Sequence, residues 1–358
     1  MARRIPSLDG IRAIAILLVL LGHSISGLPA AAFLIEWFEV GSFGVSIFFV
    51  LSGYLITRLL VEELERDGSI SLKRFYIRRF FRIVPAYYLY LTCILVVSRM
   101  GGLTVPRSGI LPAYLFVWNY AAHASGWFYG HSWSLSMEEQ FYLLWPPVLA
   151  ALGKARGLRL AVGIILVAPF SRLATYALFP AHRGQITAML HSHGDILMFG
   201  ALLALGSGED KKDKNEKFER VVSWLFARKA HVVAAFVLFA NILIGHALRG
   251  SYTLPVGMSV EAACIALLLL WLVRNPGSWV GRPLNTGPMI FIGSISYSLY
   301  LWQQAFVALF KFPWSLALTF LAALTSYHLV ELPFLRLRDR VLSGLRRPTP
   351  TTMEEVPK

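Results

Sequence analysis

Long apolar runs separated by short polar segments make up most of the chain. A helix needs about 20 predominantly apolar residues to cross the hydrocarbon core of a bilayer. The segment 109–120 is apolar but short, and we expect it to be interfacial or re-entrant. The pattern predicts an all-α, polytopic transmembrane bundle of about ten spans. The ten candidate spans are residues 11–28, 40–60, 83–99, 135–152, 158–178, 188–206, 229–248, 254–273, 288–310 and 313–332.

The positive charges favour one orientation of this bundle. Lys and Arg concentrate in the cytoplasmic loops of membrane proteins. With the N-terminus inside, 28 of the 34 Lys and Arg residues fall in segments on the cytoplasmic side. We therefore expect both termini to be cytoplasmic. Residues 1–335 are predicted to form one transmembrane domain, and residues 336–358 a disordered cytoplasmic tail.

The composition agrees with a membrane protein, since 56% of the residues are hydrophobic and only 15% are charged. The net charge of +14 comes from the cytoplasmic segments, so it does not indicate nucleic-acid binding. Cys93 and Cys264 lie inside apolar runs and suggest neither a disulfide framework nor a metal cluster. The sequence has no internal repeat, which counts against transporters built from inverted halves.

Ionisable side chains inside membrane spans are costly and are therefore candidates for function. Arg172 and Asp195 both fall in the outer half of the membrane, where we expect a buried ion pair whose role could be purely structural. His191, His193 and Asp195 alternate at a spacing that separates helix faces, so no metal site is predicted. The full set is His23, Glu138, Glu139, Arg172, His191, His193, Asp195, Glu261, His328 and Glu331.

Arg12 and His23 share the first predicted span. Eleven residues at about 100° each return to nearly the same helix face, with a separation of roughly 16 Å along the axis. Arg12 is then expected at the cytoplasmic boundary and His23 near mid-membrane. A neutral imidazole there could deprotonate an attacking hydroxyl. A buried histidine hydrogen-bonded to a neighbouring helix fits the spacing equally well.

A cluster of arginines precedes the third span. Arg79 and Arg82 are three residues apart and share a helix face. Together with Arg12 they could bind phosphate groups on the cytoplasmic side. Anchoring by positively charged loops is the alternative explanation. At the start of the fourth span, Glu138 and Glu139 could simply be stabilised by the helix dipole, and at most one of them is expected to face the bundle interior.

The outer segment 114–133 is rich in aromatic residues. Aromatic faces could stack on a sugar ring, whereas an aromatic belt at the membrane interface would give the same composition. The pattern alone leaves both interpretations open.

Several motifs, in order along nearly the whole chain, resemble the membrane acyltransferase-3 family. This family includes bacterial O-antigen and peptidoglycan O-acetylases, nodulation-factor acetylases and macrolide O-acyltransferases. The matching motifs are LDGIRA at 8–13 with LGH at 21–23, FFVLSGYLI at 48–56, RRFFRIVP at 78–85, WSLSMEEQFY at 133–142, ISYSLYLW at 295–302 and VELPF at 330–334.

The resemblance implies ten helices, acyl-CoA as the donor (most simply acetyl-CoA), and His23 as the catalytic residue of an Arg-x10-His pattern. Glu138 is expected to assist catalysis. One departure is Gln303, which stands where the family usually has histidine, so a second catalytic histidine is in doubt. The resemblance further implies cofactor-binding roles for Arg12, Arg79 and Arg82, and substrate-binding or supporting roles for Asp9, Ser52, Asp195, Tyr297 and Glu331.

The sequence thus predicts an O-acyltransferase of the bacterial cytoplasmic membrane that moves an acyl group to a hydroxyl of a carbohydrate or glycoconjugate, without a metal. A small natural product such as a macrolide is the alternative acceptor. A polytopic transporter is the alternative from a different class. Many relatives carry an added extracytoplasmic hydrolase-like domain, for which this chain is too short. We therefore expect it to act alone or with a separate partner protein.

Overall fold

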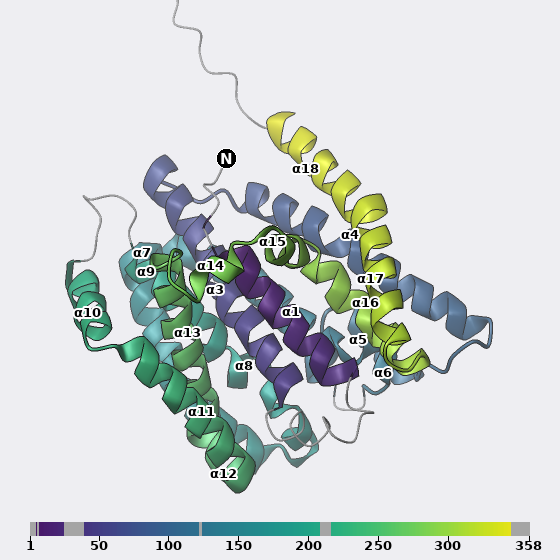
Figure 1. Ribbon diagram of the computed structural model, residues 1–358, viewed down its shortest axis with the longest axis horizontal. Helices are drawn as coiled ribbons and strands as arrows, with labels where there is room; N and C mark the ends of the chain where they lie inside the picture. The colour runs from purple at the N-terminus through teal and green to yellow at the C-terminus, as the bar shows by residue number, and fades with distance from the viewer. Residues whose placement is uncertain (1–4, 6, 25–38, 122–123, 208–215, 345–358) are drawn as a thin grey trace, which may run out of the picture.

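The computed structural model describes residues 5, 7–24, 39–121, 124–207 and 216–344. Within these residues every regular element is a helix, which confirms the predicted all-α class (Figure 1). The longer helices are α1 (Leu8–Ser24), α3 (Val40–Asp67), α4 (Leu72–Arg99), α7 (Ser132–Leu178), α9 (Asp195–Gly206), α10 (Glu216–Ala227), α11 (Ala230–Leu248), α13 (Met258–Arg274), α16 (Ser296–Leu309), α17 (Trp314–Ser326) and α18 (Leu332–Gly344).

Short helical pieces join these elements. They are α5 (Arg107–Tyr114), η1 (Trp118–Tyr120), α6 (Trp127–Gly130), η2 (Pro180–Ala188), α8 (Leu190–His193), α12 (Gly250–Tyr252), η3 (Thr253–Gly257), α14 (Gly281–Leu284), α15 (Gly287–Ser294) and η4 (Tyr327–Glu331). The apolar segment 109–120, expected to be interfacial or re-entrant, is occupied by α5 and η1.

Six helical segments of the described chain are long and apolar enough to cross a membrane, as expected of a multi-pass membrane protein. The remaining predicted spans fall on shorter helices: α1 has 17 residues, α9 has 12, and residues 288–310 are divided between α15 and α16. The count of ten therefore stays a prediction. The six segments are Val40–Asp67, Leu72–Arg99, Trp127–Leu178, Ala230–Leu248, Gly250–Arg274 and Trp314–Gly344.

The 52-residue segment Trp127–Leu178 contains two of the predicted spans. A straight helix of this length would measure roughly 78 Å, more than twice the ~30 Å core of a bilayer. Gly153 interrupts it with a left-handed φ of 69°. Beyond this kink the chain turns back on itself. The close approach of the two arms shows this, since a Cβ on Gly157 would lie 2.6 Å from Cδ1 of Leu149. The predicted spans 135–152 and 158–178 are thus the two arms of α7.

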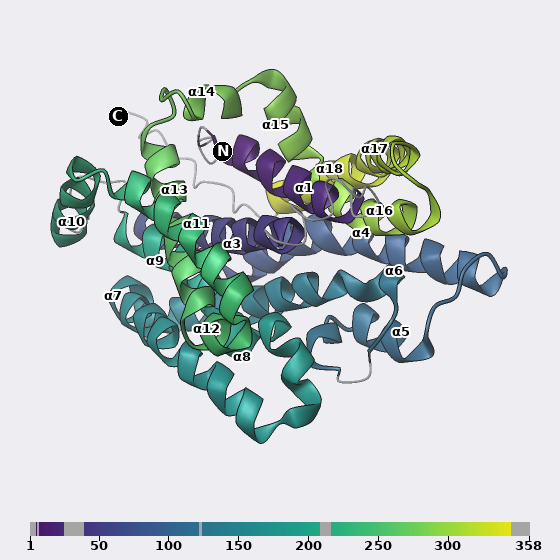
Figure 2. The ribbon, with the colours of Figure 1, turned by 60° about the horizontal axis from the view of Figure 1, so that its bottom comes forward.

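Helix α3 is the central element, lying between α1 and α7 and packing closely on α9 (Figure 2). Glycines allow the helix backbones to approach. A Cβ on Gly53 would lie 1.9 Å from the carbonyl oxygen of Leu197, and one on Gly200 would lie 2.0 Å from that of Val50. Small residues have this role in membrane bundles, where backbone proximity replaces the hydrophobic effect as the source of association.

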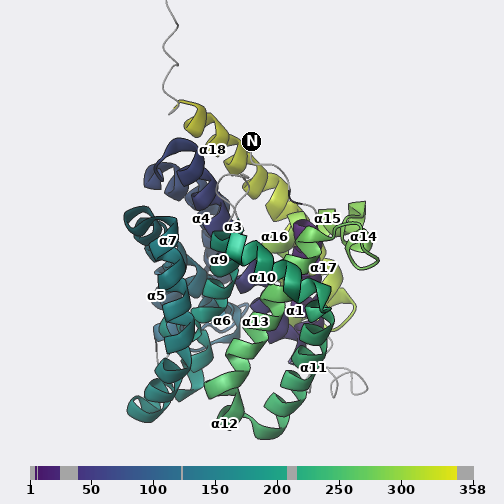
Figure 3. The same ribbon diagram turned by 90° about the vertical axis from the view of Figure 1, so that its left-hand side faces the viewer.

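Helices α17, η4 and α18 form one segment, Trp314–Gly344, so residues 336–344 of the expected tail are helical. Residues 345–358 and the first four residues lie outside the described residues, so disorder there and the sidedness of the termini stay predictions. Figure 3 shows α18 at the upper end of the molecule and α12 at the opposite, lower end.

Candidate active site

A cavity of about 130 Å³ lies between α1, α3, α4, α7 and α16. Residues from motifs far apart in the sequence converge on it. Two tyrosines that the sequence did not single out, Tyr142 and Tyr300, also line it. The predicted site residues in its lining are Arg12, Ser52, Arg79, Arg82, Glu138 and Tyr297.

The three arginines of this cavity differ in how their charges are compensated. Arg12 Nη1 lies 3.3 Å from Oδ1 of Asp9, one turn earlier on α1. Arg82 Nη1 lies 3.0 Å from Oε2 of Glu331. Arg79 has no carboxylate within ion-pair distance among the residues that the structure describes, and its guanidinium lies 5.1 Å from the ring centroid of Tyr142. The guanidinium of Arg79 is therefore a positive charge in the cavity wall that can pair with a bound anion.

Glu138 also lines the cavity. It comes from α7, whereas the arginines come from α1 and α4. The hydroxyl of Tyr142, one turn further along α7, donates to Glu138 Oε2 at 3.4 Å and is also hydrogen-bonded to Ser52 Oγ. Ser52 belongs to α3, so this group of three side chains ties α3 to α7 beside Arg79.

Glu331 and Tyr297, both predicted as supporting residues, attach the C-terminal helices to α4. Glu331 is 2% exposed, and it accepts hydrogen bonds from Ser298 Oγ and from Arg82. Tyr297 OH donates to the carbonyl oxygen of Ile83 at 2.9 Å. Glu331 thus holds the side chain of Arg82, and Tyr297 holds the backbone of the next residue.

His23 lies near the C-terminal end of α1, outside the lining of the arginine cavity. Its Nδ1 is 3.0 Å from Oε1 of Gln303 on α16, and its ring meets Trp127 edge-on at 5.6 Å between centroids. Helix α1 therefore carries Arg12 into the cavity and His23 about three turns away. Helix α16 runs beside both, with Tyr297 at the cavity and Gln303 at the histidine.

His131 is a buried histidine that the sequence analysis missed. It occupies the N-cap position of α7 without a side-chain capping hydrogen bond and is 3% exposed, and its ring centroid lies 5.0 Å from that of Tyr90 and 5.6 Å from that of Tyr300. Neither ring nitrogen has a hydrogen-bond partner among the described residues. Its place two residues before Trp133, at the start of a family motif, was the available signal. Because His131 lies just before the predicted span 135–152, it is not among the ionisable residues predicted inside the membrane.

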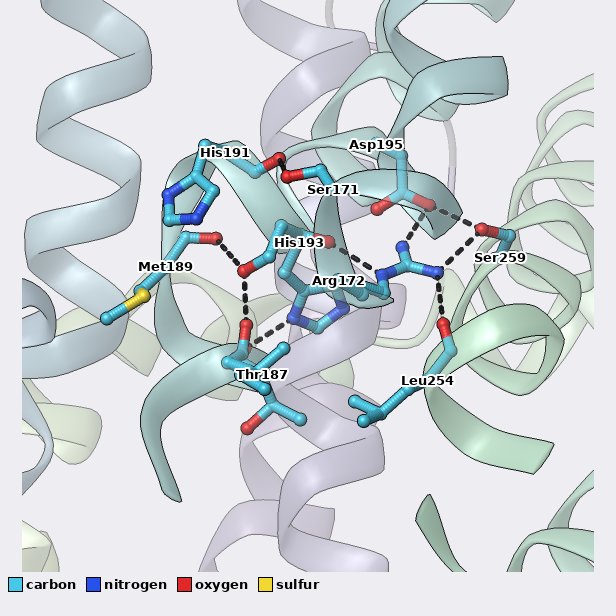
Figure 4. A network of polar contacts seen from close by, with 11 residues as sticks. Ser171, Arg172, Thr187, Met189, His191, His193, Asp195, Leu254 and Ser259 are labelled. Carbon is cyan, nitrogen blue, oxygen red and sulfur yellow. Dashed lines mark hydrogen bonds and ion pairs between the residues drawn. The ribbon is translucent and has the colours of Figure 1, made fainter. Parts of the chain in front are cut away.

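Asp195 is not part of the cavity. It forms an ion pair with Arg172, and both side chains are fully buried, which confirms the ion pair expected from the sequence (Figure 4). Ser259 joins them, accepting from Arg172 Nη1 at 3.0 Å and donating to Asp195 Oδ2 at 2.7 Å. Arg172 Nε also donates to the carbonyl oxygen of Ser192 at 2.6 Å. This network joins α7, α8, α9 and α13 away from the cavity, a position that fits a structural role.

The arrangement offers groups for anion binding and for proton transfer but no cluster of metal ligands. In the part of the chain that the structure describes, no three His, Cys, Asp or Glu side chains gather in a group that could hold a metal ion. The expectation that the reaction needs no metal stays a prediction.

A family model described as an acyltransferase domain matches residues 5–330. The chain belongs to this acyltransferase family. The match covers every residue that lines the cavity and ends one residue before Glu331. The class of enzyme predicted from the motifs is therefore confirmed at the level of the family.

Members of this acyltransferase family in several bacteria are similar to the chain. It is 27% identical over 368 residues to peptidoglycan O-acetyltransferase OatA of Listeria monocytogenes, covering 92% of this chain and 55% of that protein. It is 29% identical over 364 residues to YrhL of Bacillus subtilis, provisionally named a peptidoglycan O-acetyltransferase, with the same coverage of 92% and 55%. The chain thus spans a little over half the length of these relatives. No solved structure is significantly similar to it.

Proposed function

We propose that this member of the acyltransferase family is a multi-pass enzyme of the bacterial cytoplasmic membrane that transfers an acetyl group from acetyl-CoA to a hydroxyl of a carbohydrate or glycoconjugate. The observation that carries the proposal is the convergence of Arg12, Arg79 and Arg82 on one cavity, next to the helix that bears His23. Anchoring by positively charged loops would not require three arginines from two helices to face the same cavity.

The donor is proposed to bind through its phosphates. Arginine forks match phosphate oxygens in charge and geometry. Arg79, which has no carboxylate partner within ion-pair distance in the described chain, makes the first contact, while Arg12 and Arg82 are held in place by Asp9 and Glu331. From there the thioester arm extends along α1 toward His23, a distance of roughly 16 Å for eleven helical residues.

His23 is proposed as the general base. It accepts the proton of the acceptor hydroxyl while the hydroxyl oxygen attacks the thioester carbonyl carbon. The C–S bond then breaks, the ester forms, and the leaving thiolate takes the proton back from the imidazolium. Glu138 lies with the arginines and Tyr142, so we assign it to the donor end of the site and not to the orientation of His23.

A carbohydrate acceptor is favoured by the surroundings of His23. Trp127 is 44% exposed, although its ring edge meets the imidazole, so part of its surface is available to stack on a sugar. The relatives named for peptidoglycan O-acetylation support the same acceptor class. Family membership favours the enzyme over the transporter, and no structural observation favours a macrolide acceptor.

The test is transfer of labelled acetyl groups in membranes that contain the protein. Labelled acetyl-CoA would be supplied together with peptidoglycan fragments or lipid-linked saccharides, and alkali-labile acetyl esters on the glycan counted. We expect esters with the wild type, none above background with His23→Ala, and wild-type levels with the control His182→Ala. His182 belongs to η2, where it hydrogen-bonds to Gln185, and it does not line the cavity. Equal ester formation by wild type and His23→Ala would contradict the proposed mechanism.

A further inference from the structure

A row of three hydrogen bonds connects the backbone of α6 to the imidazole of His23. Gln304 Nε2 lies 2.7 Å from the carbonyl oxygen of Trp127. Gln303 Nε2 lies 3.3 Å from Gln304 Oε1, and Gln303 Oε1 lies 3.0 Å from His23 Nδ1. The two glutamine side chains are buried, at 0% and 5% exposed. Each polar atom in the row therefore depends on its protein partner, because a buried polar group without one is costly.

The direction of every bond in this row is fixed at its far end. A backbone carbonyl can only accept, so the group of Gln304 facing Trp127 must be its NH₂. Gln304 then presents its oxygen to Gln303, whose NH₂ must face it. Reversing Gln303 alone would place two oxygens against each other. The oxygen of Gln303 is thus left facing His23, and an amide oxygen can only accept a proton from Nδ1–H.

We infer that Gln303 and Gln304 form an amide relay that holds neutral His23 in the Nδ1–H tautomer, with the lone pair on Nε2. The tautomer of a histidine is set by the hydrogen bond that its other nitrogen makes. Nε2 points toward α3, where a Cβ on Gly41 would lie 4.0 Å away. Both glutamines are positioning residues, since they act through the imidazole. This inference rests on the proposed function only in making Nε2 the atom that removes the acceptor proton.

The relay also gives Gln303 a role that does not need proton transfer. The side chain of Gln303 is an amide, which cannot shuttle a proton near neutral pH. As an acceptor for Nδ1–H it orients the ring in the way that a carboxylate or carbonyl orients other catalytic histidines. The second bond to α6, from Trp127 Nε1 to the carbonyl oxygen of Gln304 at 2.7 Å, keeps the start of the relay in register.

The direct test is the tautomer of His23 in protein labelled with ¹⁵N-histidine and reconstituted in lipid nanodiscs. The chain has nine histidines, so the signal is assigned by its loss in His23→Gln. At a pH where the imidazole is neutral, we expect the wild type to be protonated on Nδ1. Protonation on Nε2 in the wild type would overturn the relay, whatever the Gln303 variants show.

Variants test the direction of the relay. Gln303→Met removes the acceptor and is expected to give a mixture of tautomers, with acetyl transfer lowered roughly 10- to 100-fold, as for other supporting partners of functional histidines. The KM for acetyl-CoA should be unchanged, because the donor cavity is separate. Gln303→Glu keeps an acceptor at Nδ1 and should keep the tautomer, but it removes the NH₂ that donates to Gln304 Oε1 and should therefore lower the melting temperature. The control is Gln185→Met, which removes two side-chain hydrogen bonds elsewhere, to the carbonyl oxygen of Ala121 and to His182.

The outcomes separate the relay from the proposed function. An unchanged tautomer in folded Gln303→Met would overturn the relay. A tautomer that responds as predicted, in a protein that neither binds nor consumes acetyl-CoA, would support the relay and contradict the proposed function.

Discussion

Arg82 and Glu331 lie 249 positions apart in the sequence and form an ion pair of 3.0 Å at the edge of the arginine cavity. The carboxylate is almost fully buried, with a side chain 1% exposed, whereas the arginine side chain is 28% exposed. Glu331 is the last residue of the π-helical turn η4. Pro333, two residues further on, has no N–H to donate to this turn. The C-terminal helices thus provide the carboxylate that holds one of the proposed phosphate ligands.

Replacing Glu331 with Gln should weaken donor binding more than catalysis. The variant keeps the shape of the side chain but removes the charge that holds Arg82, so the KM for acetyl-CoA should rise while kcat falls less. The loss of stability should stay below the ~3–5 kcal/mol typical of breaking a fully buried pair, because Arg82 is partly exposed. Steady-state kinetics and thermal melting in detergent would measure both. An unchanged KM would show that Arg82 does not need this partner.

The Arg172–Asp195 pair should matter for stability and not for donor binding. Both side chains are fully buried, so Asp195→Asn leaves an uncompensated guanidinium and should lower the free energy of unfolding by about 3–5 kcal/mol. The double variant Arg172→Met/Asp195→Leu should recover most of the loss, since no buried charge remains. Unfolding in detergent would report stability. Loss of acetyl-CoA binding in folded Asp195→Asn would contradict a purely structural role.

Close packing of α3 on α9 predicts opposite effects for two glycine substitutions. Gly53→Ala would place a Cβ 1.9 Å from the carbonyl oxygen of Leu197, a backbone atom that cannot move aside, so the folded yield and melting temperature should fall. Gly163→Ala is the control. It lies in the second arm of α7 with nothing within 4 Å of its Cβ position, and it should be neutral or stabilising by up to about 1 kcal/mol. Equal melting temperatures would contradict the described α3–α9 contact.

The sequence predicted the features that local pattern determines. Apolar runs located the helices, and the eleven-residue spacing from Arg12 to His23 placed them on one helix at opposite ends of the site. Helix periodicity predicted that Arg79 and Arg82 share a helix face, whereas their convergence with Arg12 was one of two interpretations that the sequence left open. The kink at Gly153 agrees with the two spans expected on either side of it.

Contacts between distant segments could not be predicted in the same way. His23 and Gln303 are 280 positions apart, and only the packing of α16 beside α1 brings them together. His131 lies just before a predicted span, so nothing in its local pattern shows that the fold buries it against Tyr90 and Tyr300. Asp195 was expected among the residues that bind substrate or support the site. The fold places it instead in a separate network with Arg172, away from the cavity.

The measurement that tests the central claim most directly is binding of acetyl-CoA to the purified protein in detergent, comparing Arg79→Gln with Arg78→Gln. Arg78 is adjacent in sequence and has the same charge but does not line the cavity. A charge-assisted hydrogen bond contributes ~1.5–3 kcal/mol, so losing Arg79 should weaken binding roughly 10- to 100-fold. Arg78→Gln should bind like the wild type. Equal binding by both variants, or no saturable binding by folded wild-type protein, would contradict the assignment of this cavity to the acyl donor.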